Sequence, residues 1–181
     1  MFWCADRVIL GKSGSLPDGS SSPLPDTPAE DLRIAGAPMI DLIRDVIGRG
    51  ASIKVIASGC SMAPFIKDGD ILTLSPLPAR APECGDVVAF KFPQTDRMMI
   101  HRVIEVHRVR YLVKGDYLSG PDCLIAKSDI LGLLSRVERA GSRVRIGIGP
   151  GKALISYLSA RSVLFPLLSL AYRIRRQFQA V

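Results

Sequence analysis

Short runs of aliphatic and β-branched residues recur through the middle of the chain, and Gly, Pro or Asp separates each run from the next. Such runs are typical of strands that are joined by tight turns. The pattern therefore predicts a mainly β fold, with a compact β domain from about residue 50 to 148. The runs are "SIKVIA" at 52–57, "DILTLSPL" at 70–77, "DVVAFKF" at 86–92, "MMIHRVIEVHRV" at 98–109, "YLVKGD" at 111–116, "DILGLLSRVER" at 129–139 and "RVRIGI" at 143–148.

One short helix is expected before the strands, in "PMIDLIRDVIG" at 38–48, because Pro38 suits a first helical turn and Gly48 suits a C-terminal cap. The stretch at 11–31 is rich in Ser, Pro and Gly, a composition typical of a flexible tail or linker. We therefore expect three parts. They are a flexible tail at 1–36, a β domain with a short N-terminal helix at 37–149, and a C-terminal helical segment at 150–181.

The C-terminal segment "ALISYLSARSVLFPLLSLAYRIRR" at 153–176 is apolar around most of a helical circumference and ends in arginines. One interpretation is a peripheral membrane contact, because apolar residues followed by basic ones suit an anionic interface. The other is a terminal helix, kinked near Pro166, that packs on the domain or on a partner. No run of about 18 uncharged apolar residues occurs, so no spanning helix is expected.

The N-terminal apolar patch is broken by Asp6 and Arg7, so we expect no cleavable signal peptide. The chain of 181 residues carries a formal net charge of +7, which suits an anionic neighbour. Basic stretches do not alternate with aromatic residues, so nucleic acid is not expected as a partner. The four cysteines form no CxxC pair and there are two histidines, so we expect reduced thiols, no metal and no cofactor. The expected location is membrane-associated or cytoplasmic.

Ser61 lies in "ASGCSMAPFIKDGDIL", a Gly- and Pro-rich stretch where a serine is ordinarily a turn residue. A serine becomes a nucleophile only beside a base that a third group orients. The candidate bases are His101 and His107, which we expect on one face of a strand and ~20 Å apart. Candidate carboxylates are Asp116 and Asp122 in "KGDYLSGPD". Spacing alone makes this a weak indication of catalysis.

Four motifs, taken in order, resemble the successive conserved boxes of the S24/S26 serine peptidase superfamily, which contains type I signal peptidases and LexA-type self-cleaving repressors. They are "SGCSMAPFIKDGDIL", "GDVVAF", "HRVIEV" and "KGDYLSGPD", and the resemblance covers roughly residues 52 to 136. The His-Arg-Val box is similar to that of archaeal and endoplasmic-reticulum signal peptidases, which use histidine. The resemblance implies a compact β-rich peptidase fold, an extended peptide or preprotein substrate, and cleavage through an acyl-enzyme.

Carried over to this sequence, the resemblance makes Ser61 the nucleophile and His101 the general base, with the Ser61 backbone N–H as an oxyanion donor. Histidine is a suitable base at neutral pH. Asp122 follows Gly-Pro in a loop, and we favour it as the group that orients His101. Asp116 follows a strand directly, and we expect it to form the turn or to serve as a second carboxylate.

The residues around Ser61 complete the candidate site. Gly59 occupies the position where some bacterial signal peptidases carry a hydroxyl that binds the oxyanion, and Pro64 belongs to the nucleophile box. Cys60 is expected to be structural, because neighbouring side chains on an extended backbone point to opposite sides. Met62 could pack beside the cleft or fill the core, and the sequence leaves both open.

The remaining basic side chains are expected to lie on the surface and to take no part in the site. Lys67, Lys91 and Lys114 are expected to be solvated charges at strand ends, because a catalytic lysine has to be buried. His107 is expected on the surface.

Three functions remain open at this point. The first is an endopeptidase that acts on another chain. The second is a self-cleaving protein of LexA type, with the Ala35–Gly36 bond as the candidate for cleavage. The third is a non-catalytic module that binds peptides by strand addition.

Overall fold

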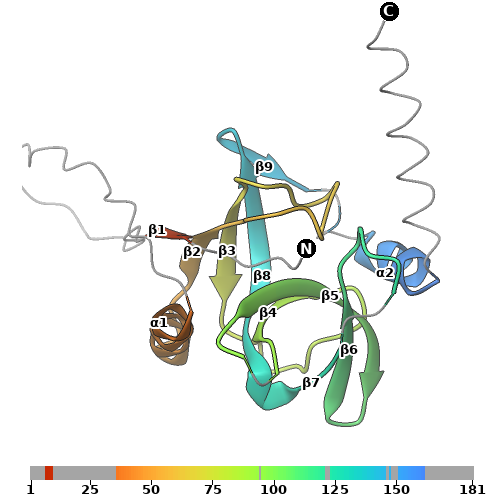
Figure 1. Cartoon of the computed structure of the whole chain (residues 1–181), viewed down its shortest axis with the longest axis horizontal. Coiled ribbons are helices and arrows are strands. Elements are labelled where there is room, and N and C mark those ends of the chain that lie inside the picture. Colours follow the sequence, from red (N-terminus) through yellow and green to blue (C-terminus); the bar gives the residue numbers. More distant parts are fainter. Residues whose placement is uncertain are drawn as a thin grey trace, which may run out of the picture.

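A strongly curved antiparallel sheet makes up most of the structure (Figure 1). The computed structural model describes residues 7–9, 36–93, 95–120, 123–145, 147 and 151–161. The strand order is β1-β2-β3-β8-β4-β5-β6-β7, and β9 pairs with β8. Every pairing is antiparallel, and the predicted mainly β fold, with one helix before strands β2–β9 and one after them, is confirmed.

The helices of the described residues are α1 (Ala37–Gly48) and α2 (Lys152–Ala160), and a 3-10 turn occupies Lys127–Asp129. The strands are β1 (Arg7–Ile9), β2 (Ile53–Ile56), β3 (Ile71–Ser75), β4 (Val87–Lys91), β5 (Met98–His107), β6 (Arg110–Lys114), β7 (Cys123–Ala126), β8 (Ile130–Arg139) and β9 (Ser142–Val144).

Each of the seven predicted runs overlaps a strand, although β6 and β9 each begin one residue before the run and β9 ends at Val144. The helix α1 begins one residue before its predicted first residue. Two strands were not predicted. One is β7, a four-residue strand that pairs with β6. The other is β1, which lies within the segment expected to be a tail and pairs with β2. Residues 10–35, the remainder of the predicted linker, lie outside the described residues.

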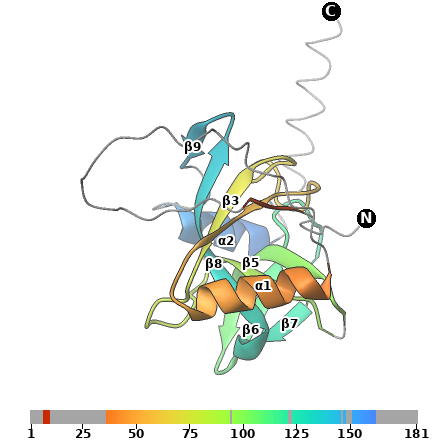
Figure 2. The same ribbon diagram turned by 90° about the vertical axis from the view of Figure 1, so that its left-hand side faces the viewer.

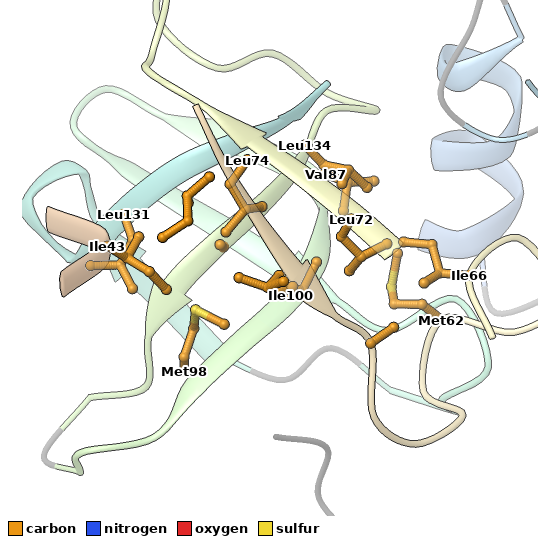
Figure 3. Close-up of a cluster of buried hydrophobic side chains, with 14 of the residues drawn as sticks. Ile43, Met62, Ile66, Leu72, Leu74, Val87, Met98, Ile100, Leu131 and Leu134 are labelled. Atoms are coloured by element: carbon orange, nitrogen blue, oxygen red, sulfur yellow. The ribbon is translucent and has the colours of Figure 1, made fainter. Parts of the chain in front are cut away.

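Apolar side chains form two clusters on opposite faces of the sheet. The larger cluster joins Met39, Ile40 and Ile43 of α1 to side chains of β2, β3, β5 and β8 (Figure 3). Figure 2 shows α1 lying across the outside of the sheet, where it covers this cluster. In β4, Val87 and Ala89 belong to one cluster, while Val88 and Phe90 belong to the other. Because successive strand residues point to opposite faces, a strand that is buried on both faces reads as a continuous apolar run.

The second helix, α2, packs against β5 with its polar side inward. Ser156 is buried and its hydroxyl donates to the Val103 carbonyl at 3.0 Å. Leu154 and Tyr157 are 64% and 56% exposed, so apolar side chains occupy the outer side of α2. Neither described helix has the length and apolarity that crossing a membrane requires.

Asp86, which immediately precedes β4, links the first residue of α2 to the sheet. Its buried carboxylate accepts hydrogen bonds from Lys152 Nζ at 2.6 Å, Arg80 Nη1 at 3.0 Å and the Glu83 backbone N–H at 3.0 Å. Burial alone would raise the pKa of Asp86, but the hydrogen bonds from Lys152, Glu83 and Arg80 outweigh burial and hold this pKa below its ordinary value. The ionised carboxylate is therefore the form that stabilises the fold.

Asp86→Asn should lower the free energy of unfolding at pH 7 by about 2 kcal/mol, because charge-assisted hydrogen bonds are lost. This corresponds to a fall in melting temperature of about 4–8 °C. A lowered folded-state pKa gives stability that is complete above the ordinary Asp pKa of about 4 and is lost as pH falls through the folded value. Thermal unfolding of both proteins should therefore show the difference shrinking below about pH 4.

The matched control is Asp96→Asn, which removes an exposed carboxylate from its surface ion pair with Lys91. It should leave the melting temperature almost unchanged at every pH. A difference between wild type and Asp86→Asn that stays constant from pH 7 to pH 3 would contradict the assigned role of the ionised carboxylate.

Candidate active site

The loop that carries Ser61 follows β2 and is held at both ends. Gly59 has a φ of +96°, a conformation that favours glycine, and its N–H donates to Asp68 Oδ1 at 2.7 Å. Met62 is fully buried in the larger apolar cluster, next to Ile66 (Figure 3). Of the two roles that the sequence left open for Met62, core filling is the one observed. The buried methionine directly after Ser61 anchors the loop in the core.

Ser61 and His101 lie within hydrogen-bond distance of each other. The distance between Ser61 Oγ and His101 Nε2 is 3.0 Å, and both side chains are buried, with exposures of 6% and 0%. His101 lies on β5 opposite Val88, and its ring contacts the Phe90 ring at a centroid distance of 6.0 Å. A neutral imidazole that carries its proton on Nδ1 offers Nε2 as an acceptor for the serine hydroxyl. The geometry is that of a hydroxyl beside its general base.

The loop after β6 fixes the backbone of Ser61. The Tyr117 N–H donates to the Ser61 carbonyl at 2.8 Å. A Cβ added at Gly115 would lie 2.8 Å from the same carbonyl oxygen, closer than real Cβ atoms come to backbone atoms. Only glycine allows this approach, so the "KGDY" motif holds Ser61 through its backbone.

A buried ion pair lies directly behind the candidate site. Arg102 Nε and Nη2 donate to the two carboxylate oxygens of Asp116 at 2.9 and 2.7 Å, and both side chains are 0% exposed. Arg102 Nη1 donates to the carbonyls of Gly85 and Gly147 at 2.9 and 2.8 Å. The guanidinium also lies over the Phe65 ring, 5.7 Å from its centroid.

The candidate acidic residues have different positions. Asp116 binds Arg102 with both oxygens, so its observed contact is an ion pair behind the candidate site. Asp122 lies outside the described residues. Ala35, one side of the bond considered for self-cleavage, also lies outside them, and Gly36 immediately precedes α1.

The expectation that His101 and His107 share a face of one strand is wrong. The pairing of β5 with β6 shifts between Val103 and Glu105, which inserts a bulge. Residues paired across strands share a face, so the bulge places His107 on the face opposite to that of His101. His107 is exposed, as expected, and its ring nitrogen lies 2.9 Å from Glu105 Oε2.

The prediction of solvated lysines is confirmed for Lys67, which is exposed, and for Lys91, which forms a surface ion pair with Asp96 at 3.0 Å. It is wrong for Lys114, which is 1% exposed and donates from Nζ to the Ser159 carbonyl. The cause is α2, which covers the end of β6. Nothing in the strand pattern revealed this cover.

Cys60 and Pro64, the other two residues predicted around Ser61, are exposed in the loop between β2 and β3. The exposed thiols of Cys60 and Cys84 form no disulfide. Sequence reasoning missed Arg102 as a component of the site. A signal was present, because an arginine inside the apolar run "MMIHRVI" has to find a buried anionic partner.

No family model matches the sequence. Over 99 residues the chain is 33% identical to the protein named signal peptidase complex catalytic subunit SEC11C from human, dog and mouse. The match covers 47% of this chain and 50% of each relative. This chain is homologous to the catalytic subunits of signal peptidase. The homology and the mainly β fold confirm the resemblance to signal peptidases, and the chain spans about half the length of the curated relatives it matches.

Proposed function

We propose that the chain is a serine endopeptidase of signal-peptidase type, which cleaves an extended peptide segment of another chain, such as a preprotein. The observation that carries the proposal is the 3.0 Å contact between Ser61 Oγ and His101 Nε2. Both residues are buried and belong to a rigid frame, since Ser61 is tied to Tyr117 and His101 lies on a central strand. Homology to a signal peptidase catalytic subunit supports the reaction class.

In the proposed reaction, Ser61 Oγ attacks the substrate carbonyl carbon while His101 Nε2 takes the hydroxyl proton. The Ser61 backbone N–H donates to the oxyanion of the tetrahedral intermediate. His101 then gives the proton to the leaving amine as the peptide C–N bond breaks. Water attacks the acyl-enzyme, its proton passes to His101, and the ester bond to Ser61 breaks to release the acid.

The strand edges near this pair suit an extended substrate. β6 pairs with β5 only from Arg102 onward, so the stretch Met98–His101 has a strand partner on its β4 side alone among the described residues. Ser61 follows β2 in the chain, and its Oγ lies 3.0 Å from His101 on β5, so an edge of either strand could hold a peptide near the serine. A peptide that adds as a strand there would pass the nucleophile in extended form.

Ser61→Ala should abolish both peptide cleavage and labelling by a serine-directed acylating probe, while circular dichroism and melting temperature stay close to those of wild type. His101→Ala should reduce turnover to a comparable extent, because nucleophile and base act as a unit. The readouts are mass spectrometry of probe-treated protein and of peptide products.

The matched control for Ser61→Ala is Ser128→Ala, which removes an exposed hydroxyl at the 3-10 turn far along the chain. It should label and cleave as wild type does. Labelling of Ser61→Ala near the wild-type level would overturn the assignment. Products from the protein's own chain in the absence of added peptide would instead support self-cleavage.

We further propose that Asp122 orients His101, which leaves Asp116 to its ion pair with Arg102. Asp122→Asn should reduce turnover by ~10⁴ with little change in melting temperature, because an amide can stabilise the wrong imidazole tautomer. Asp116→Asn should instead destabilise the fold by roughly 3 kcal/mol, since it weakens a buried ion pair. Melting temperature and rate per folded molecule decide between these roles. The reverse pattern would exchange them.

The outer side of α2 supports membrane contact by the segment 153–176. Leu154 and Tyr157 are exposed there, and Arg161 lies over the Tyr157 ring at 5.1 Å. Apolar side chains beside a cation suit the boundary between anionic headgroups and acyl chains. We propose that this side of α2 rests on an anionic membrane surface.

The double variant Leu154→Glu, Tyr157→Glu should bind vesicles of anionic phospholipid at least about tenfold more weakly than wild type, because two buried apolar contacts are lost. Flotation of the full chain with such vesicles measures the difference. Val109→Glu is the control, because Val109 is 73% exposed on the turn between β5 and β6. Equal flotation of the wild type and the double variant would exclude α2 as the contact.

A further inference from the structure

The strand that leads to the nucleophile, β2, is flanked by two unequal neighbours. On one side it pairs with β3, and this contact continues past Ile56, where the Ala57 N–H donates to the Asp70 carbonyl at 2.8 Å and the Gly69 N–H donates to the Ala57 carbonyl at 2.9 Å. On the other side its partner is β1, the three-residue strand Arg7–Ile9. Without β1, β2 would be an edge strand with unpaired backbone groups.

The register places β1 beside the approach to Ser61. Arg7 lies opposite Ile56 and Ile9 lies opposite Lys54, so the N-terminal end of β1 faces the end of β2 that leads into the nucleophile loop. Backbone groups on this edge of β2 are the same groups that an extended peptide would use if it added to the sheet beside Ser61. An added peptide and β1 cannot pair with this edge at the same time.

The pairing of β1 is short and its covalent connection is long. Three paired residues are fewer than the five or six of an ordinary strand. Residues 10–35 join β1 to the rest of the domain, and a connection of that length and composition gives a tethered segment an effective concentration in the millimolar range at most. A short ladder held at such a concentration can exchange with a competing strand.

We infer that β1 is a built-in occupant of the peptide-docking edge of β2, which an extended peptide substrate has to displace. The inference rests on the proposed function, because it identifies the strand edge at which that substrate binds. When β1 is docked, the edge is closed and the backbone of β2 is satisfied. When β1 leaves, the edge is open to a peptide. The apparent affinity for substrate is then the affinity of the open edge multiplied by the fraction of molecules in which β1 is undocked.

The test uses the full chain with Val8→Pro and Ile9→Pro together. Successive N–H groups of a strand point to opposite edges, so one of two adjacent prolines necessarily removes an N–H that faces β2. The control is Ser20→Pro with Ser21→Pro, which places the same two prolines in the Ser/Pro/Gly-rich stretch. Melting temperatures of both variants establish that the domain remains folded.

Two readouts are compared. The first is binding of a fluorescent peptide with the sequence of residues 5–11, "ADRVILG", measured by polarisation, which requires no catalysis. The second is kcat/KM for a short peptide substrate. The variant with Val8→Pro and Ile9→Pro, the β1 variant, should bind the fluorescent peptide about three- to tenfold more tightly than wild type. Its kcat/KM should rise by the same factor, because the docking equilibrium of β1 limits both quantities. The control variant should match wild type in both.

The outcomes separate this inference from the proposed function. Tighter peptide binding by the β1 variant without peptidase activity in any of the proteins would contradict the proposed peptidase and support strand exchange. Equal peptide binding by the β1 variant and wild type would overturn the inference, whatever the activity. A further measurement needs no substitution, since an excess of the free peptide should speed amide hydrogen exchange at residues 7–9 of the unaltered chain. Unchanged exchange there would also overturn it.

Discussion

The buried pair of Arg102 and Asp116 is the contact on which the geometry of the candidate site depends. Removing two charges from water costs free energy, and two parallel hydrogen bonds with additional carbonyl acceptors offset that cost here. Arg102 directly follows His101, and Asp116 directly follows Gly115, where a Cβ would collide with the Ser61 carbonyl. This ion pair therefore joins the segment that carries His101 to the segment that supports the backbone of Ser61.

Apolar packing and polar contacts have separate tasks in this fold. The two apolar clusters bury both faces of β4 and the inner side of α1, but side chains of similar size can exchange places in such cores at modest cost. Directional contacts fix the positions of the segments around the site. Arg139, for example, binds both oxygens of Asp70 at 2.8 and 2.7 Å, and the Lys67 N–H donates to the same carboxylate at 2.8 Å. These contacts hold the C-terminal end of the loop between β2 and β3, which carries Ser61, against β8.

The strands were predictable because each carries its own local signal of β-branched residues ended by a turn. The pairing of Ser61 with His101 was predictable only through the resemblance of ordered motifs, because their closeness arises from contacts across the sheet. Burial of Lys114 was not predictable, since it depends on a helix that arrives from the other end of the domain. The face occupied by His107 was mispredicted for a similar reason. A bulge is a property of a strand pair, and a single strand pattern does not reveal it.

The position of α2 in the chain has a consequence for the order in which the molecule is completed. Arg102 needs the carbonyl of Gly147, Asp86 needs Lys152, and Lys114 needs the carbonyl of Ser159. These two carbonyl acceptors and one ammonium donor come from residues 147–159, which are synthesised after Ser61, His101 and every described strand. A chain that emerges from the ribosome N-terminus first therefore carries Ser61 and His101 well before the groups that satisfy the buried charges around them. The contacts of these three buried charges are therefore complete only after residues 147–159 have been made.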